Sequence, residues 1–532
     1  MALKTSETRH ILNLHCAACR MLSQVGAYVK TKVKQIRQGG AISCLYLTIL
    51  CLVPLVAVAI FLRVHMRDAE YYIIYIDTED EASYVVDENY LSLGLDSTVI
   101  TDGFTHFNMS DGNLIKMIKH LSPSYLRVGG NQADQIVFSR TEVSRKENTS
   151  DVYVLTASDW TKLYHLSKKA NVTIIYDLNS LLRYDNGTWS SENAREMLEF
   201  SQENNFSVNW ELGNEPNSYP KKFNTLVNAS QLGIDYIFLR ELLNTYPFYA
   251  NSSLIGPSVT RLRTKYIEEY LLKFLKAGYE AITAMTFHHY YFSGVNVTWE
   301  EFVDPENFDY LESCINAVKS VTSLIKDFDK PIWLGETATA WHGGAPNMSD
   351  RFLGSFLWID KLGLSAKMAI DVVVRQSMFK GDYALINDTY YPNPDWWLSV
   401  LYKKLVGGKV ITTKTEGDAR IRLYAHCAKY NELWQDGAAV VVFGVNINNY
   451  KGLVQVKELH SDSEIYSYSL KADGDLFSQF VQLNGKLLEL DSNMNLPKFE
   501  PKVIQRQNIM EIDPMSIVFW VFTNTNVDAC SS

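Results

Sequence analysis

Between about residues 91 and 406, strand-like and helix-like segments alternate with a regularity that few folds accommodate. Eight short runs rich in β-branched and aromatic residues recur there: SLGLDSTVI, SYLRVGG, NVTIIYDLN, FSVNWELGNEP, SLIGPSV, AITAMTFHHYY, KPIWLGET and AIDVVVRQSMF. Amphipathic stretches such as SENAREMLEFSQENN and TKYIEEYLLKFLKAG lie between them. This alternation favours a closed parallel barrel over an open sheet. The sequence therefore predicts an α/β fold with a (β/α)8 TIM barrel at residues 91–406.

A different pattern begins after Gly407. Six β-rich runs, from ARIRLYAHCAKY to SIVFWVFTN, are separated by turn residues without a convincing helix. Short strands divided by turns are typical of an antiparallel sandwich. We therefore predict an appended antiparallel β-sandwich domain at residues 407–532. Residues 68–90 contain an early strand, YYIIYID, which we expect to join that sandwich.

Residues 41–62 form an uncharged apolar run, AISCLYLTILCLVPLVAVAIFL. A helix of this length spans the roughly 30 Å hydrocarbon core of a bilayer. The preceding residues 1–40 are basic, which favours their retention in the cytoplasm. We therefore expect a cytoplasmic tail (1–40), a single transmembrane signal anchor (41–62) and a type II protein whose remainder is lumenal or extracellular. A cleaved signal peptide, giving a secreted form, is the competing interpretation.

Glycosylation motifs agree with this orientation. Asn-X-Ser/Thr sequons, the acceptor sites of N-glycosylation, occur ten times, and none precedes the apolar run. The predicted acceptors are Asn108, Asn148, Asn171, Asn186, Asn205, Asn228, Asn251, Asn296, Asn347 and Asn387.

Cysteine and charge patterns limit the remaining functions. Three cysteines follow residue 67, which allows one disulfide and one free thiol. Cys16 and Cys19 lack a second ligand pair at zinc spacing, so we expect no metal site there. Residues 68–532 carry 41 Lys and Arg against 59 Asp and Glu. Such an acidic region repels polyanions at long range, so nucleic acid is not an expected partner.

Two predicted strands end in glutamates. Glu215 lies at the end of the fourth run and Glu336 at the end of the seventh, 121 residues later. Because all strands of such a barrel end at one mouth, these side chains can converge there. Pro216 is expected to hold Glu215 in an extended backbone at the rim. Glu211, deeper in the strand, is expected to be a buried, paired structural carboxyl.

Two carboxyl groups that flank one bond are the requirement for glycoside hydrolysis. One must be protonated as the acid, and a separation of about 5 Å makes the other a nucleophile and retains anomeric configuration. Mutual repulsion is expected to keep one of them protonated near neutral pH. An ordinary rim salt bridge is the alternative for a single strand-end glutamate, but the paired motifs favour catalysis.

Longer stretches resemble a known family. The chain is similar to the heparanase-type family of retaining endo-β-glucuronidases in WELGNEPNSY, TFHHYYFSG, WLGETATAWHGGAP, FLWIDKLGLSAKM, NPDWWLSVLYKKLVG and the closing VDAC. The similarity runs from about residue 70 to the C-terminus. It implies a barrel joined to a sandwich built from both chain ends, with Glu215 as general acid/base and Glu336 as nucleophile.

The same resemblance implies roles for other residues. Asn214 would hydrogen-bond the 2-hydroxyl of the attacked uronate, and Gly343 would offer a backbone donor to its carboxylate. His288 and Tyr290 would lie at the catalytic subsite, with aromatic packing as the alternative. Arg263 would grip sulfate or carboxylate unless it is a solvated surface charge. Further implied features are substrate contacts at Asp96, Asn131 and Tyr383, and a Cys427–Cys530 disulfide that leaves Cys314 unpaired.

Departures from the family pattern bear on processing and specificity. Only SRTEVSRKENTSDVYVL stands where vertebrate-type members carry a long excised linker, so we expect an active single-chain monomer. Arg145 and Lys146 are the candidates for the basic residues at that linker's end. Val295 replaces a basic contact, Arg261 stands at a neutral position, and His342 replaces a glycine.

The favoured function is hydrolysis of heparan sulfate-type glycosaminoglycans without a metal or organic cofactor. One alternative is a glucuronidase that acts on poorly sulfated or other glucuronide glycans. The other is a non-catalytic heparan sulfate-binding relative, which the intact Gly335-Glu336-Thr337 motif disfavours. The expected location is a lysosomal or cell-surface membrane.

Overall fold

A computed structural model describes residues 69–79, 81–141, 152–434 and 438–531. Residues 71–532 form one compact unit. The predicted tail and anchor, the sequon at Asn148, and Arg145 and Lys146 lie outside the described residues. Within the described ranges, no helix has the length and apolar character needed to cross a bilayer.

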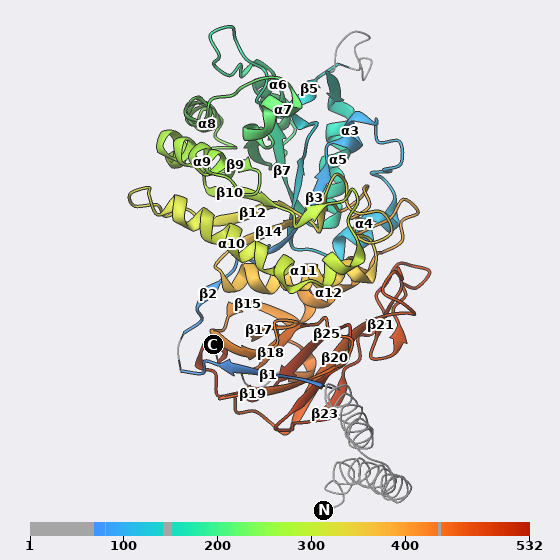
Figure 1. The fold of residues 1–532 in the computed structure, drawn as a ribbon. Helices are drawn as coiled ribbons and strands as arrows, with labels where there is room; N and C mark the ends of the chain where they lie inside the picture. Colours follow the sequence, from blue (N-terminus) through green and yellow to red (C-terminus); the bar gives the residue numbers. More distant parts are fainter. Residues whose placement is uncertain (1–68, 80, 142–151, 435–437, 532) are drawn as a thin grey trace, which may run out of the picture. The chain divides into compact units, whose positions relative to one another are not determined.

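Eight parallel strands close into a barrel, which confirms the predicted architecture (Figure 1). Each strand pairs with the next, and the last pairs with the first. The order along the chain is β3 (Leu91–Asp96), β4 (Ser124–Gly129), β7 (Val172–Leu178), β8 (Asn209–Leu212), β9 (Leu254–Val259), β10 (Ala284–His289), β12 (Ile332–Thr337) and β14 (Val372–Arg375). Every one of these strands overlaps its predicted run. Their carboxyl ends therefore face one mouth, where a site can be assembled from distant segments.

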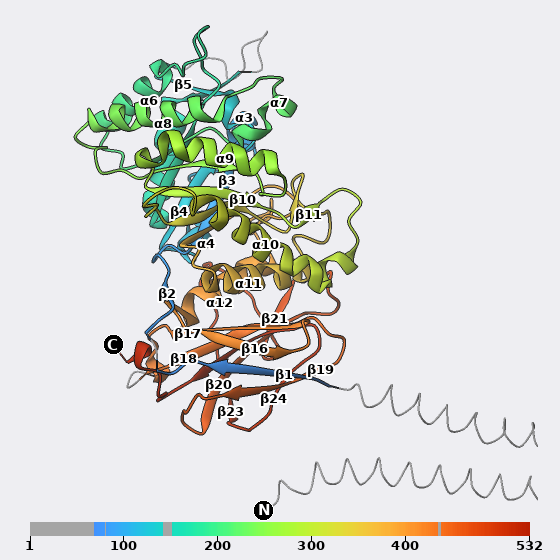
Figure 2. The same ribbon diagram turned by 60° about the vertical axis from the view of Figure 1, so that its left-hand side comes forward.

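Helices surround the strands (Figures 1 and 2). They are α4 (Gly112–Lys119), α5 (Ala157–Ala170), α6 (Glu192–Glu203), α8 (Ala229–Asn244), α9 (Lys265–Gly278), α10 (Pro305–Thr322), α11 (Phe352–Lys367) and α12 (Pro394–Leu405). Helix α9 shows the pattern clearly, because its buried residues Ile267, Tyr270, Leu271 and Phe274 recur at intervals of three and four. This spacing places them on one helical face, towards the barrel.

The second part of the described chain is a two-sheet sandwich. One sheet has the order β16 (Thr413–Gly417), β1 (Ala69–Ile76), β19 (Lys451–Lys457), β24 (Met510–Ile512). The other has the order β2 (Tyr84–Val85), β15 (Val406–Val410), β17 (Ile421–Ala428), β18 (Val440–Asn446), β25 (Ser516–Phe522), β20 (Glu464–Ala472), β21 (Val481–Leu483), β22 (Lys486–Leu487), with β23 (Lys502–Gln505) beside β20. Strand β1 pairs antiparallel with β16, which confirms that the early strand joins the sandwich.

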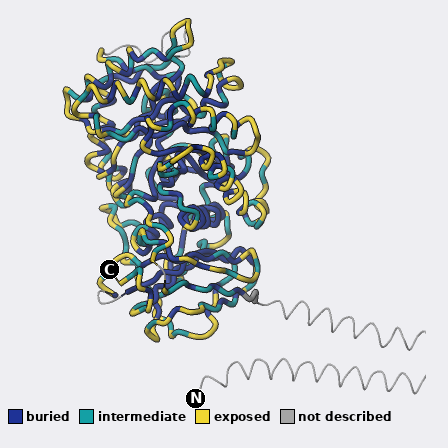
Figure 3. The backbone as a smooth tube through the Cα atoms, turned by 90° about the vertical axis from the view of Figure 1, so that its left-hand side faces the viewer, coloured by how far each residue is buried: buried dark blue, intermediate teal, exposed yellow. Residues whose placement is uncertain are grey.

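Strand β18 is buried along its whole length because both of its faces are covered (Figure 3). Val440 and Val442 pack in the core between the two sheets. Val441 and Phe443 belong to the larger core that includes the barrel helices. Arg422 Nε, on the neighbouring strand β17, donates to the buried Asp360 of α11 at 2.6 Å. The sandwich therefore supports the barrel through both apolar packing and a charged contact.

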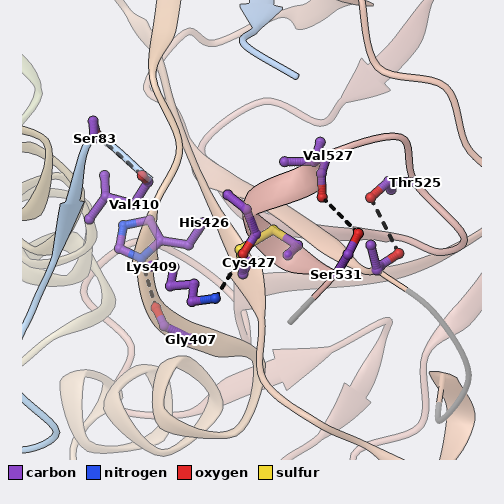
Figure 4. Close-up of a disulfide and its surroundings, with 12 residues drawn as sticks. Ser83, Gly407, Lys409, Val410, His426, Cys427, Thr525, Val527 and Ser531 are labelled. Atoms are coloured by element: carbon purple, nitrogen blue, oxygen red, sulfur yellow. Dashed lines mark hydrogen bonds between the residues drawn. A yellow bond between two sulfur atoms is a disulfide. The ribbon is translucent and has the colours of Figure 1, made fainter. Parts of the chain in front are cut away.

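Cys427 and Cys530 form a disulfide, the pairing that the family resemblance implies (Figure 4). Cys427 lies on β17, and Cys530 ends the short 3-10 turn Asp528–Cys530. The Nζ of Lys409 donates to the Ala529 carbonyl at 2.9 Å, close to this disulfide. Cys314, on α10, is buried and free. The last residues of the described chain are thus tied to the sandwich.

Candidate active site

A cleft of about 780 Å³ opens at the carboxyl ends of the barrel strands. Glu215, His288 and Glu336 meet there, and one ligand atom from each lies within 4.8 Å of the others. Glu336 is the last-but-one residue of β12, whereas Glu215 follows the end of β8 by three residues. The two predicted glutamates therefore converge although 121 residues separate them.

The backbone of Glu215 corrects one prediction. Its φ and ψ are 52° and 54°, so it occupies the left-handed region and not the extended conformation expected before Pro216. Proline disfavours the right-handed helical region for the residue before it, and this loop takes the left-handed alternative. The conformation is fixed because Glu215 N donates to the Ser258 carbonyl at 3.0 Å and Ser218 N donates to the Glu215 carbonyl at 2.8 Å. Left-handed non-glycine residues are uncommon and concentrate at functional sites.

Pro216 has a second effect. It begins the 3-10 turn Pro216–Ser218, which leads directly into the short helix α7 (Tyr219–Lys222). This turn brings the last residue of α7 back towards the glutamate, so that Lys222 Nζ lies 2.6 Å from Glu215 Oε2. The turn that begins at Pro216 therefore places the Lys222 ammonium beside Glu215, the predicted acid.

The charge state of Glu215 also differs from the prediction. Burial, the largest influence, raises the pKa of Glu215, but the Lys222 ammonium and the hydrogen bond with His288 outweigh it and lower this pKa to about 2. The contact with His288 Nδ1 is 3.1 Å long. In this arrangement Glu215 is ionised, so repulsion from Glu336 does not by itself keep it protonated. The reason is that the Lys222 ammonium lies in direct contact with Glu215, which sequence reasoning did not anticipate.

Glu336 is held from the opposite side by donors on the barrel strands. Tyr290 Oη donates to Glu336 Oε1 at 2.7 Å, and Arg127 Nη1 donates to Oε2 at 2.8 Å. Burial and the neighbouring Glu336 charge raise the pKa of Tyr290 well above its usual value, so the phenol stays a donor. Both oxygens of this carboxylate are thus satisfied by charged or strongly polar donors, which suits an ionised nucleophile.

Arg127 is a functional residue that sequence reasoning missed. It lies on β4 and is 1% exposed. Besides Glu336, it donates from Nε to Glu211 at 2.6 Å and from Nη2 to Asn214 at 2.9 Å. Glu211 is fully buried, which confirms the prediction of a paired structural carboxyl. An arginine inside the otherwise apolar run SYLRVGG was the available signal, because buried arginines are almost always paired.

Two further aspartates lie beneath this network. Asp134 accepts hydrogen bonds from Asn214 N at 3.0 Å and Tyr219 Oη at 2.7 Å, and so fixes the loop that carries Glu215. Asp177, on β7, is 3.6 Å from Arg127 Nη2. Among the described residues, neither Asp177 oxygen has a hydrogen-bond partner. Burial and the nearby Glu211 charge raise the pKa of Asp177 well above its usual value.

The other predicted substrate positions occupy the same cleft, with one exception. Asp96, Asn131, Arg263, His288, Tyr290, Gly343 and Tyr383 all line it. Asn214 lies just behind the wall, 1% exposed, with its Oδ1 bound to Arg127. The rings of Tyr290 and Tyr383 are stacked with centroids 6.4 Å apart, so the aromatic packing named as the alternative for Tyr290 is present in the cleft lining.

The cleft is more basic than the chain as a whole. Lys221, Lys222, Arg261, Arg263 and Lys380 line it, against the acids Asp96, Glu215 and Glu336. Arg261 is anchored, because its Nη1 donates to the Tyr290 and Tyr291 carbonyls at 2.8 Å and its guanidinium lies over the Trp341 ring. Arg263 is exposed. A local basic surface of this kind suits an anionic ligand despite the acidic average charge.

Glu215, His288 and Glu336 also have the atom types of a metal site. However, the Lys222 ammonium and the Arg127 guanidinium already contact these carboxylates at 2.6 Å and 2.8 Å. Cations at those distances compete with a metal ion for the same oxygens. The donor set is therefore a poor fit to a metal.

Comparisons with known proteins agree with this geometry. Residues 97–363 match the model described as glycosyl hydrolase family 79, N-terminal domain. The chain is 32% identical to heparanase of Bos taurus, covering 84% of this chain and 90% of that protein. It is 31% identical to inactive heparanase-2 of Homo sapiens (84% and 87% covered) and 30% identical to hyaluronoglucuronidase of Hirudo nipponia (84% and 96% covered).

Solved structures support the architecture. The fold is similar to that of a 4-O-α-L-rhamnosyl-β-D-glucuronidase from Fusarium oxysporum, with a TM-score of 0.61 and 13% identity. The match covers 84% of this chain and 99% of that chain. At this identity the likeness concerns the fold alone.

Proposed function

The chain belongs to glycosyl hydrolase family 79, and from this premise we propose that it is a retaining endo-β-glucuronidase acting on heparan sulfate-type glycosaminoglycans. The observation that carries the proposal is the approach of a Glu215 oxygen to a Glu336 oxygen within 4.8 Å. Retaining glycosidases place their carboxyls about 5–5.5 Å apart, whereas inverting enzymes leave room for an intervening water.

The mechanism has two displacements. In the first, Glu336 attacks the anomeric carbon while Glu215 protonates the leaving oxygen, which gives a glycosyl-enzyme ester. In the second, Glu215 removes a proton from water as the water attacks the same carbon and Glu336 departs. Arg127 and Tyr290 stabilise the Glu336 carboxylate before the attack and after its release. Both steps use only side chains of this chain.

Substrate positions follow from the cleft lining and the family resemblance. We assign Asn214 to the 2-hydroxyl of the attacked uronate, and the Gly343 backbone to its carboxylate. Gly343 has a φ of +83°, and no atom lies within 4 Å of where a Cβ would be, so the cleft is open beside it. Arg263 is assigned to an anionic group further along the chain of sugars. Asp96, Asn131 and Tyr383 complete the proposed contacts.

A second candidate function is hydrolysis of poorly sulfated or other glucuronide glycans. Val295, which the resemblance places at a basic contact, is 58% exposed and carries no charge. The similarity to the Hirudo nipponia hyaluronoglucuronidase also favours this candidate. A non-catalytic, heparan-binding role is disfavoured because both carboxyls and their donors are in place.

Size analysis of digestion products separates these functions. The purified protein is incubated with heparan sulfate, unsulfated heparosan and hyaluronan, with Glu215→Gln and Glu336→Gln as controls. The proposal predicts intermediate-length fragments from heparan sulfate and loss of cleavage in both variants. Preferential cleavage of heparosan or hyaluronan would establish the second candidate, and binding without cleavage would leave only the non-catalytic role.

The cellular setting remains a proposal of its own. We propose that residues 41–62 anchor a type II membrane protein whose catalytic part is lumenal or extracellular, at the lysosome or cell surface, and that the enzyme is a single-chain monomer. Carbonate extraction, protease protection and sizing of the mature chain test these points. A secreted product lacking residues 1–62, or two processed subunits, would contradict them.

A further inference from the structure

The contacts of Glu215 in this structure suit an ionised carboxylate and not the protonated acid that the first step needs. That step needs a proton on Glu215, but this carboxylate is paired with the Lys222 ammonium at 2.6 Å. Something must therefore change between the free enzyme and the reacting complex. This reasoning rests on the proposed function, because only a glycoside-hydrolysing Glu215 must be protonated to start.

Lys222 is the group best placed to change. Its side chain is 25% exposed at the cleft wall, whereas that of Glu215 is 14% exposed. It ends α7, a helix of only four residues, and also donates to Asn131 Oδ1. Partly exposed lysine pairs are weak and exchange partners readily because the ammonium is flexible and well hydrated.

The other groups around Glu215 are more firmly fixed. His288 approaches from β10 and is 1% exposed. Glu336 approaches from β12 and is held by Tyr290 and Arg127. The same cleft is lined by Lys221, Arg261, Arg263, His342 and Lys380, and Asp96 is its remaining acid. Of the side chains in contact with Glu215, Lys222 is thus the one that a ligand can reach.

We propose that Lys222 is a positioning residue that pairs with Glu215 in the free enzyme and transfers to a sulfate or carboxylate of the bound glycan, so that Glu215 acquires its proton only when an anionic sugar is present. Anionic groups compete directly for an ammonium because it has no acceptor preference beyond charge and proximity. Lys222 then contributes to specificity by coupling the charge of the substrate to the readiness of the acid.

The proton balance is simple. When Lys222 leaves, the Glu215 carboxylate takes one proton from hydronium ion or buffer acid in the solvent and becomes a carboxylic acid. As the glycosidic C–O bond breaks, its electron pair goes to the leaving oxygen, which receives that proton. Glu336 supplies the electron pair for the new bond to the anomeric carbon. Lys222 keeps its own protons throughout.

The test compares pH profiles for size-matched sulfated and unsulfated oligosaccharides. The basic limb of kcat/KM reports the acid in the free enzyme, and that of kcat reports it in the complex. In the wild type, we expect the basic limb of kcat/KM to lie at the same pH for the sulfated and the unsulfated oligosaccharide. The basic limb of kcat should lie about one pH unit higher with the sulfated oligosaccharide. One nearby charge shifts a pKa by about this amount. In Lys222→Gln, the kcat/KM limb moves to higher pH and the two kcat limbs coincide. Lys222→Arg retains the wild-type pattern.

Control variants distinguish a failure of the role proposed for Lys222 from a failure of the proposed function. Lys168→Gln removes an exposed lysine of α5 remote from the cleft lining and should reproduce the wild-type limbs. Lys222→Gln with unmoved limbs and only a raised KM would overturn the role proposed here and make Lys222 a simple binding residue. If Glu215→Gln and Glu336→Gln still cleave the substrates, the proposed function itself fails. If they are inactive, that function stands whatever Lys222 does.

Discussion

The site has two regions: a floor formed by Glu336, Arg127 and Tyr290, and a wall formed by Glu215 and Lys222. The partners of the two carboxylates differ in burial. On the floor, Glu336 is bound by Arg127 and Tyr290, both buried and carried by or adjoining barrel strands. On the wall, Glu215 is bound by Lys222 from a four-residue helix. The proposed nucleophile, Glu336, must stay ionised, whereas the proposed acid, Glu215, must gain and lose a proton. The buried donors of the floor thus suit a carboxylate whose charge stays constant. The partly exposed Lys222 of the wall suits a carboxylate whose charge changes.

The largest expected effect comes from breaking the floor at Arg127. Arg127→Gln leaves Glu211 and Glu336 as buried carboxylates without their cation. Removing one partner of a buried pair costs about 3–5 kcal/mol, so the free energy of unfolding should fall by that amount. We also expect kcat to fall by more than about a thousandfold because the nucleophile loses its orientation. Urea unfolding and steady-state kinetics measure these effects.

Arg127→Lys is the matched control, since it keeps the charge without the guanidinium fork. It should recover part of the stability and little of the activity. Wild-type kcat in Arg127→Gln would show that the floor is not needed for the nucleophile.

A smaller loss is expected from Tyr290→Phe. This change removes one donor to Glu336 and keeps the ring that stacks on Tyr383. A hydrogen bond to a charged group is worth about 1.5–3 kcal/mol, which corresponds to a decrease of roughly 10- to 150-fold in kcat. The melting temperature should also fall, because Tyr290→Phe leaves a buried carboxylate oxygen without its donor. A large fall in stability with intact kcat would instead assign the phenol to folding.

The smallest effect concerns Asp177, the buried acid that the floor does not satisfy. Its folded-state pKa is raised by burial, so the folded protein keeps a proton that the unfolded chain loses above about pH 4. Stability therefore falls as pH rises from that value towards the folded-state pKa. Asp177→Asn imitates the protonated form and should be about 1–3 kcal/mol more stable at pH 7, with little difference at pH 4. Denaturation at both pH values checks this, and a less stable variant at pH 7 would show that Asp177 is ionised.

Part of the fold and part of the site could be predicted from the sequence. The eight strands and the early sandwich strand were predictable because alternating patterns and turn residues are local signals. The two glutamates were predictable because parallel strands end at one mouth. Closure of the barrel, however, places Arg127 of β4 beside residues of β8 and β12, and no local pattern encodes that contact.

The conformation of the Glu215 loop was missed for a similar reason. Pro216 excludes one backbone region, but the choice between the remaining ones depends on the hydrogen bond to Ser258, a residue of the next strand. The same turn decides where Lys222 falls, and so the charge state of Glu215. Sequence reasoning identified the chemical groups, whereas their charges depended on contacts between distant segments.

Covalent trapping shows which of the two glutamates forms the glycosyl ester. A 2-fluoro-glucuronosyl substrate with a good leaving group slows the second displacement, so a retaining enzyme accumulates its ester. Peptide mass spectrometry of the trapped protein should show the added sugar on the peptide that contains Glu336, and Glu336→Gln should show none. A sugar on Glu215 or another residue, or hydrolysis of natural substrate with no adduct and an inverted product, would contradict the assignment of nucleophile and acid.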